Sequence, residues 1–278
     1  MNTDIKLVAL DLDRTTLNSE SHLSEVNRQA LIDAISNGVH VCIASGRAFD
    51  TLPEDIISVP GIEYAITSNG AAIYRIAGKE CLKSYLLTPS SVKTILNLTA
   101  NDTVTYEAFI KGQAFASTEY TAHPEKYGAT EHSLAYVKKT RILKDDIKDF
   151  ILEHCHELDS LDIVVGNEEL KKNIMDRIRN ATDEVYMTSS ISQLLEISYK
   201  DAGKKSGVKF LTEYLGLSRE NVAAFGDADN DTDMIEYAGV GIAMENAAPH
   251  LKQIADHVTL HHDKDGVAYA FRNILNIC

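Results

Sequence analysis

The 278-residue sequence has few cysteines and no long apolar run, and each shortage excludes a class of protein. Four cysteines without CxxC spacing favour free thiols over a disulfide framework or a zinc site. No run of about 18 apolar residues occurs, so no membrane span is predicted. The polar start leads into an apolar stretch that is too short for a signal-peptide core. We therefore expect a cytoplasmic protein that crosses no membrane.

Basic residues are also scarce relative to acidic ones, with 27 Lys and Arg against 41 Asp and Glu and a formal net charge of −14. Such a surface repels nucleic acid and anionic membranes, and no block rich in Lys or Arg offsets it. We expect neither as a partner. An anionic substrate would bind only where a metal ion or a few cations reverse the local field.

Histidine is clustered in two places, at residues 154–156 and at His261-His262. Adjacent residues on a helix point apart, and no second ligand pair with the spacing of a structural zinc site is present. We interpret these as surface histidines.

Short apolar runs alternate with helical patterns at both ends of the sequence. Residues 7–10 and 39–44 are typical of buried strands, and between them a helical pattern starts at Ser24 and ends at Gly38. The C-terminal part repeats the alternation, with helices predicted over 204–215, 231–238, 250–255 and from Gly266, and strands over 222–225, 240–243 and 257–259. This order predicts an α/β fold, a doubly wound parallel sheet with helices on both faces.

The middle of the chain has a different pattern. Its predicted helices lie near 90–99, 144–157 and 168–181, and its strands at 104–106, 163–165, 185–187 and 194–197. These indicate an inserted α+β domain over residues 86–199, between core segments 1–85 and 200–278.

Chemically active residues follow the predicted strands. Ligands of open α/β sheets bind at the carboxyl ends of the strands, so residues at those ends are expected to converge. Four carboxylates, a lysine and a hydroxyl would meet there: Asp11, Asp13, Asp227, Asp231, Lys204 and Ser45.

Each feature alone has an ordinary explanation. An Asp after a strand commonly caps a helix or forms a turn, Ser45-Gly46 is an ordinary turn, and Lys204 is by default a solvated residue. Residues 227–233 would then be an acidic loop. The order of the features and their shared place at strand ends favour the functional interpretation.

Together these residues resemble the four motifs of haloacid dehalogenase-like hydrolases. The motifs are Asp11-Leu12-Asp13-x-Thr15, Ser45-Gly46-Arg47, Lys204 and Gly226-Asp227-x-x-Asn230-Asp231-x-x-Met234. Residues 66–71, which include Asn69, and residues 243–247 resemble further signatures of the Cof-type sugar-phosphatase branch. The resemblance implies a Rossmann-like core with an inserted cap of type II, subtype B.

The resemblance also implies a Mg²⁺-dependent phosphatase acting on small phosphorylated metabolites. Asp11 would attack phosphorus, forming an aspartyl-phosphate, and Asp13 would serve as acid and base. Lys204 would neutralise charge on the nucleophile and the transferring group. The metal ligands would be Asp11, Asp13 through its backbone carbonyl, Asp227 and Asp231, and phosphate or substrate would contact Ser45, Gly46, Arg47, Asn69 and Asn230. Two carboxylates beside a phosphate repel it, so a hard divalent cation fits the residue chemistry as well.

Two positions need a choice. Lys204 and Lys205 are neighbours, and the length of the following helix favours Lys204. Arg14 stands where the family usually has glycine, so either the loop adopts ordinary angles or Arg14 is held under strain. We expect its side chain to point to the mouth of the site, so that Arg14→Gly would leave metal binding intact and change KM.

Other functions remain open. A phosphomutase or other phosphotransferase could use the same core, and a non-catalytic metal- or ligand-binding module could keep the fold. A dehalogenase is disfavoured because halide displacement needs neither Asp13 nor a metal, and a nicotinamide enzyme because acids replace GxGxxG after the first strand. Sugar phosphates, flavin mononucleotide and pyridoxal phosphate all remain candidate substrates, and the oligomeric state is not predicted.

Overall fold

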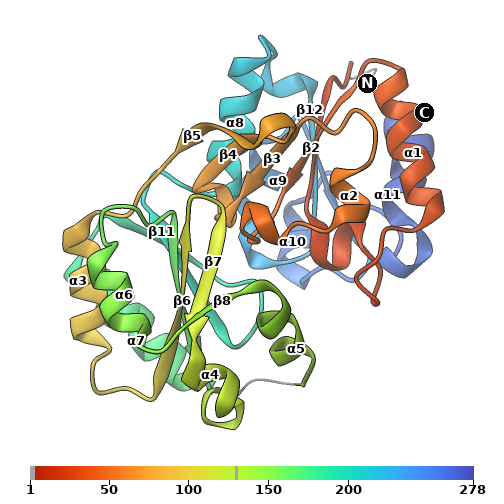
Figure 1. Cartoon of the computed structure of the whole chain (residues 1–278). Helices are drawn as coiled ribbons and strands as arrows, with labels where there is room; N and C mark the ends of the chain where they lie inside the picture. Colours follow the sequence, from red (N-terminus) through yellow and green to blue (C-terminus); the bar gives the residue numbers. More distant parts are fainter. Residues whose placement is uncertain (1–3, 129–130) are drawn as a thin grey trace. The chain divides into compact units, whose positions relative to one another are not determined.

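The computed structural model describes residues 4–128 and 131–278, which divide into two compact units. The core unit contains the described residues up to Arg47, together with Leu52–Lys83 and Gly203–Cys278. The insert unit contains Ala48–Thr51 and the described residues of Ser84–Ala202. Each unit is built on a sheet of its own (Figure 1).

The core sheet has eight strands in the order β14-β13-β12-β1-β2-β3-β4-β5. The strands from β14 to β3 run parallel, and β4 returns antiparallel beside β3. Their bounds are β1 (Leu7–Leu10), β2 (His40–Ala44), β3 (Tyr64–Thr67), β4 (Ala72–Arg75), β5 (Glu80–Ser84), β12 (Val222–Gly226), β13 (Val240–Ala243) and β14 (His257–Val258).

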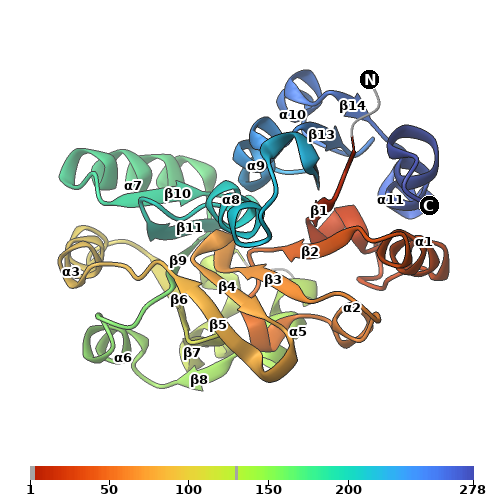
Figure 2. The ribbon, with the colours of Figure 1, turned by 90° about the horizontal axis from the view of Figure 1, so that it is seen from above.

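Helices cover both faces of the core sheet (Figure 2). On one face lie α1 (Glu25–Ser36) and α11 (Gly266–Ala270), and on the other α8 (Lys204–Tyr214) and α9 (Thr232–Tyr237). The remaining helices of this unit are the short α2 (Glu54–Ile57) and α10 (Pro249–Ile254). All four residues of β1 are buried, as a strand covered on both faces requires. The predicted doubly wound α/β class is confirmed.

The ends of α1 follow the sequence signals that predicted them. The Ser24 side chain accepts a hydrogen bond from the Asn27 N–H (3.1 Å), which caps the first turn. Gly38 follows the helix in the left-handed conformation with φ 82°, which glycine adopts without a steric penalty.

The insert sheet has six strands in the order β10-β11-β9-β6-β7-β8, antiparallel from β10 to β7 and parallel between β7 and β8. Its strands are β6 (Val104–Ile110), β7 (Gln113–Ser117), β8 (Ile142–Lys144), β9 (Ser160–Val165), β10 (Val185–Thr188) and β11 (Leu194–Tyr199). Its helices are α3 (Pro89–Leu98), α4 (Thr118–Ala122), α5 (Glu131–Thr140), α6 (Ile147–Glu153) and α7 (Glu168–Ala181). In the described part of both units, no helix has the length and apolarity needed to cross a membrane.

The two faces of the insert sheet differ in polarity. Tyr106, Ala108 and Ile110 of β6 pack in the apolar cluster formed with α3, α6 and α7. Since side chains alternate along a strand, Glu107 faces the other way, and its Oε2 lies 2.6 Å from Nη2 of the buried Arg141. Because its helices α3, α6 and α7 pack on one face of a mostly antiparallel sheet, the insert is an α+β unit, as predicted.

Several elements of the insert differ from the sequence-based expectation. The helix predicted near 144–157 is α6, which begins at Ile147 because Lys144 ends β8 and Asp146 caps the helix by accepting from the Asp149 N–H (3.0 Å). The strands β7 and β8 were not predicted.

Asp159 in the insert is expected to make stability depend on pH. Ser84 Oγ donates to its Oδ1 (3.1 Å), whereas its Oδ2 has no hydrogen-bond partner among the residues the structure describes. Burial raises the pKa of Asp159 to about 6. Because the pKa is higher in the folded chain than its unfolded value of about 4, the stabilisation it gives is present below pH ~4 and lost as the pH rises through 6.

Asp159→Asn removes this titration. Relative to wild type, the free energy of unfolding of the variant should therefore rise by up to about 3 kcal/mol between pH 4 and pH 7. Urea denaturation at a series of pH values measures this difference. Asp176→Asn, at an exposed position of α7, is the control. A difference that stays constant across the series for Asp159→Asn would contradict the prediction.

Candidate active site

Three parallel strands end side by side at the carboxyl edge of the core sheet. Leu10, the last residue of β1, pairs with Ile43 of β2 and with Phe225 of β12. The residues that follow these strands, including Asp11 and Asp227, therefore lie at one edge.

The chain leaves strand geometry directly after Asp11. The Asp11 N–H still donates to the Phe225 carbonyl (3.1 Å), and the next five residues, Leu12–Thr16, form a wide turn closed by the Leu17 N–H donating to the Leu12 carbonyl (2.9 Å). The turn separates the two aspartates of the first motif. Asp11 is 6% exposed, whereas the Asp13 side chain is 50% exposed.

Lys204, the first residue of α8, is fully buried and joins two carboxylates. Its Nζ donates to Asp11 Oδ1 (2.7 Å) and to Asp231 Oδ1 (2.6 Å). Burial works against its charge, but Asp11 and Asp231 raise the pKa of Lys204 above its ordinary value, so it is a cation. Of the two neighbouring lysines, the structure brings Lys204 to the carboxylates and leaves Lys205 exposed.

Asp231 is fixed at both carboxylate oxygens. While Oδ1 accepts from Lys204, Oδ2 accepts from the backbone N–H groups of Asp227 (2.9 Å) and Ala228 (3.0 Å). The carboxylate packs so closely on Gly226 that a β-carbon there would lie 2.4 Å from its Cγ. Only glycine allows this approach.

Asp227 is buried with longer compensating contacts than Asp231. Thr15 Oγ1 donates to its Oδ1 (3.3 Å), and Asn246 Nδ2 donates to its Oδ2 (3.5 Å). Arg14 Nε lies 3.8 Å from the same Oδ2. Burial and then Asp231 raise the pKa of Asp227 to about 7, against the opposing effects of Arg14, Lys204 and Thr15.

Three buried carboxylates thus meet in one place. Oxygens of Asp11, Asp227 and Asp231 lie within 4.8 Å of one another. Burial raises the pKa of Asp11 well above its usual value; Lys204 opposes the shift and the two other carboxylates add to it. Asp11 Oδ2 accepts no hydrogen bond from the described residues. Buried carboxylates that repel one another and offer open hard oxygen ligands fit a divalent cation such as Mg²⁺.

Asp13 and Arg47 form a separate pair. Arg47 donates through Nε to Asp13 Oδ2 (2.8 Å) and through Nη2 to Asp13 Oδ1 (2.6 Å), a bidentate arrangement. Ser45 is buried, and its Oγ accepts from the Arg47 N–H (3.2 Å), while Gly46 between them is half-buried. Arg47, which was predicted to bind phosphate, therefore binds the side chain of Asp13, the predicted acid and base.

Asn69 and Asn230 form a second buried pair, in which Asn230 Nδ2 donates to Asn69 Oδ1 (3.0 Å). The Asn69 N–H donates to the Ser45 carbonyl (3.1 Å), which ties the turn after β3 to the end of β2. The next residue, Gly70, has φ 88°, and a β-carbon there would lie 1.9 Å from the carbonyl oxygen of Gly203. The turn thus packs against the residue before Lys204.

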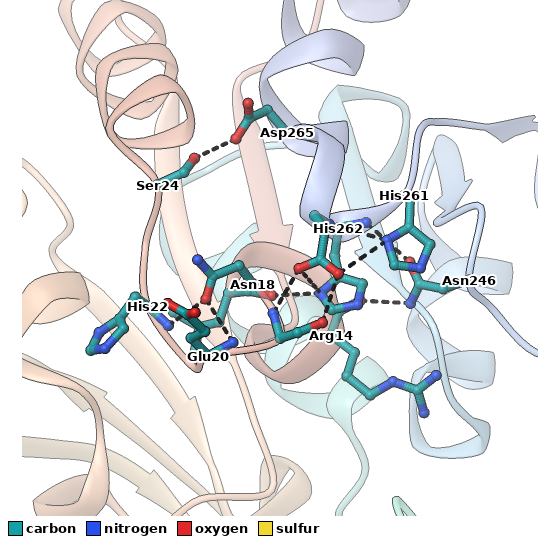
Figure 3. A network of polar contacts seen from close by, with 12 residues as sticks. Arg14, Asn18, Glu20, His22, Ser24, Asn246, His261, His262 and Asp265 are labelled. Carbon is teal, nitrogen blue, oxygen red and sulfur yellow. Dashed lines mark hydrogen bonds and ion pairs between the residues drawn. The ribbon is translucent and has the colours of Figure 1, made fainter.

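Arg14 adopts the left-handed conformation (φ 63°, ψ 15°), so of the two expected alternatives the strained one is present. Figure 3 shows the contacts that surround its turn. Asn246 Nδ2 donates to the Arg14 carbonyl (2.8 Å), and Asn246 Oδ1 accepts from the His262 N–H (3.1 Å). Asn246 lies within the 243–247 signature, but no spacing in the sequence identifies a side chain that bonds a backbone carbonyl over 200 residues away.

The interpretation of both His261 and His262 as surface residues is wrong for His262, which is 5% exposed and whose Nδ1 bonds the Leu17 carbonyl (3.0 Å). The two histidines are not on an α-helix, and their rings lie 4.5 Å apart rather than pointing away from each other. With Asp263 they form a second group of possible metal ligands. However, the Nδ1 atoms of both histidines already take part in hydrogen bonds within the chain.

Known proteins that resemble this chain indicate the same family as the motifs do. A family model described as haloacid dehalogenase-like hydrolase matches residues 8–271. The Bacillus subtilis (strain 168) protein named 5-amino-6-(5-phospho-D-ribitylamino)uracil phosphatase YcsE is 31% identical over 273 residues, which cover 98% of this chain and 96% of that protein.

Solved structures share the fold. A haloacid dehalogenase-like hydrolase from B. subtilis aligns with a TM-score of 0.82 at 27% identity, over 98% of this chain and 100% of that one. The subclass IIB sugar phosphatase BT4131 aligns with a TM-score of 0.82 at 20% identity, over 98% and 100% of the two chains. The resemblance drawn from the motifs is confirmed: the chain belongs to the haloacid dehalogenase-like hydrolases and is a phosphatase.

Proposed function

We propose that this phosphatase uses Mg²⁺ and hydrolyses small phosphorylated metabolites through an aspartyl-phosphate on Asp11. The proposal rests on the buried Asp11 carboxylate, which accepts a hydrogen bond from Lys204 at Oδ1 and none from the described residues at Oδ2. Bound Mg²⁺ would supply the positive charge that keeps the clustered carboxylates ionised and offsets the phosphoryl charge. It would be held by Asp11, the Asp13 backbone carbonyl and Asp227, with Asp231 as a further ligand or as a support for Lys204.

The chemistry divides into two displacements. An Asp11 oxygen attacks phosphorus while the ester P–O bond breaks, and the Asp13 carboxyl gives its proton to the departing alcohol. Asp13 then takes a proton from water, whose oxygen attacks the same phosphorus, and the bond to Asp11 breaks to release inorganic phosphate. Lys204 stays charged throughout and offsets the negative charge that grows on the transferring group.

We propose that the phosphate contacts Ser45, Gly46 and Arg47, with Asn69 and Asn230 supporting substrate binding. Since both Asp13 oxygens accept from Arg47, Asp13 must leave Arg47 before it can donate a proton. A phosphate oxygen that takes over the guanidinium would release it.

For the domains, we propose that residues 1–85 and 200–278 are the catalytic core and residues 86–199 a cap, in a cytoplasmic enzyme. The relative YcsE is named as a phosphatase of a phosphorylated ribitylamino compound, and BT4131 is described as a sugar phosphatase. A phosphate monoester of a sugar or polyol is therefore the substrate class we propose.

The assay that tests this proposal measures free phosphate from a panel of esters, with Mg²⁺ and after its removal by EDTA. The panel contains sugar phosphates, flavin mononucleotide, pyridoxal phosphate and 5-amino-6-(5-phospho-D-ribitylamino)uracil. Mg²⁺-dependent release supports the proposal. Transfer to a second sugar hydroxyl without free phosphate would identify a phosphomutase, and binding without turnover a non-catalytic module.

Asp13→Asn is expected to lower kcat on alkyl phosphates by about 10²–10⁴-fold, because the alkoxide then leaves without a proton. On p-nitrophenyl phosphate the first displacement should be slowed far less, since nitrophenolate is stable unprotonated, while the second displacement still lacks its base. The pre-steady-state burst of nitrophenolate measures the first displacement, and steady-state assays on the alkyl ester measure the loss of turnover. The control is Glu20→Gln, which also removes one negative charge, at an exposed position. Unchanged release from the alkyl ester would rule out Asp13 as the acid.

A further inference from the structure

Arg14 is held in its unusual conformation by contacts of its backbone. Its carbonyl accepts from Asn246, which the His262 N–H fixes in turn (Figure 3). The left-handed region disfavours residues with a β-carbon, and the related motif usually has glycine here. Because these hydrogen bonds do not involve the guanidinium, a substitution of the Arg14 side chain keeps the contacts that stabilise the turn.

The Arg14 side chain brings a positive charge to one edge of the carboxylate cluster. Its Nε lies 3.8 Å from Oδ2 of Asp227, and the side chain is 63% exposed while that of Asp227 is 4% exposed. Lys204 bonds the other two carboxylates, Asp11 and Asp231. Each carboxylate of the cluster therefore has a cation from the chain beside it.

The charges of the cluster limit how strongly a divalent cation binds. With Lys204 and Arg14 charged, three ionised carboxylates leave a net charge of −1 for the ion to neutralise; without the Arg14 charge they leave −2. A divalent cation that approaches Asp227 Oδ2 also meets the guanidinium at short range. Part of the attraction is thus already offset before the ion binds.

We infer that Arg14 is an internal counter-cation of Asp227 that weakens Mg²⁺ binding, so that its charge sets the Mg²⁺ concentration at which the site fills. The inference rests on the proposed use of Mg²⁺ by this site. It replaces the expectation from sequence that removing Arg14 leaves metal binding unchanged.

Isothermal titration calorimetry of the full chain with MgCl₂, without substrate, tests the inference. Arg14→Gln, which removes the charge but keeps a side chain of similar reach, should lower the dissociation constant for Mg²⁺ by about 3- to 10-fold at low salt, a range that allows for screening of an exposed charge. Arg14→Lys keeps the charge and should stay near the wild-type constant. The gain in Arg14→Gln should shrink in 0.5 M KCl, because salt screens exposed charges.

Arg272→Gln is the matched control, since it removes one positive charge at an exposed position of the core unit. It should leave the Mg²⁺ affinity unchanged. Thermal melting of each metal-free variant shows that it is folded before titration.

The outcomes are distinct from failure of the proposed function. Equal affinity in wild type and Arg14→Gln, or the same gain in Arg14→Lys, overturns the inference while Mg²⁺-dependent phosphate release still supports the function. A raised KM for the ester with unchanged Mg²⁺ affinity overturns it too, and assigns Arg14 to the substrate anion. Wild-type protein that releases phosphate equally in EDTA and takes up no Mg²⁺ contradicts both.

Discussion

Asp11→Asn is expected to abolish phosphate release, with a loss of about 10⁴-fold or more, because an amide cannot form the acyl phosphate. The fold should persist. Asn Oδ1 can still accept from Lys204 Nζ, and burial already raises the pKa of Asp11 well above its usual value, so a neutral side chain suits the site. The thermal midpoint at pH 7.5 should therefore not fall.

The control for this variant is Asp229→Asn, because Asp229 lies in the loop after β12 but is exposed. It should retain the wild-type rate. Rapid acid quenching and mass spectrometry of wild-type enzyme should find phosphate on the peptide that contains Asp11. Phosphate release by Asp11→Asn within tenfold of wild type would eliminate Asp11 as the nucleophile.

Lys204→Met is expected to lower both activity and stability strongly. Methionine has a similar length but no charge, so Asp11 and Asp231 lose the cation that lies 2.7 and 2.6 Å from their oxygens. Breaking a buried ion pair by removing one partner typically destabilises a protein by 3–5 kcal/mol, and we expect about that loss in urea denaturation.

The neighbouring residue provides a control of the same chemistry. Lys205 is exposed, so Lys205→Met should change the free energy of unfolding by no more than about 0.5 kcal/mol and leave turnover near wild type. Equal effects of the two substitutions would contradict the assignment of the buried cation to Lys204.

The arrangement of the site at the sheet edge could be predicted from sequence because it follows from local signals. Strands buried on both faces are apolar throughout, so the end of β1 is visible where Leu10 gives way to Asp11. The same reasoning placed Asp227 after β12. Parallel strands bring such ends together whatever the details of packing.

What sequence could not predict depends on partners far along the chain. Asp13 pairs with Arg47 and the Arg14 carbonyl with Asn246, and neither pairing has a spacing that identifies it. The strand β8 has only three residues and forms only because β7 offers it an edge. The buried position of His262 likewise involves a distant partner, the Leu17 carbonyl that its Nδ1 bonds.

The order of strands in the core sheet has a consequence for biosynthesis. β1 lies between β2, which follows it closely, and β12, whose Val222 pairs with Leu7. A ribosome releases Asp11 long before Lys204, Asp227 or Asp231, so a nascent chain carries the proposed nucleophile without its partners and β1 with an open edge. Since chains emerge from the N-terminus onwards, the insert can fold while the core still waits for its last strands. The cluster of Asp11, Lys204, Asp227 and Asp231 can thus form only after Asp231 has been synthesised.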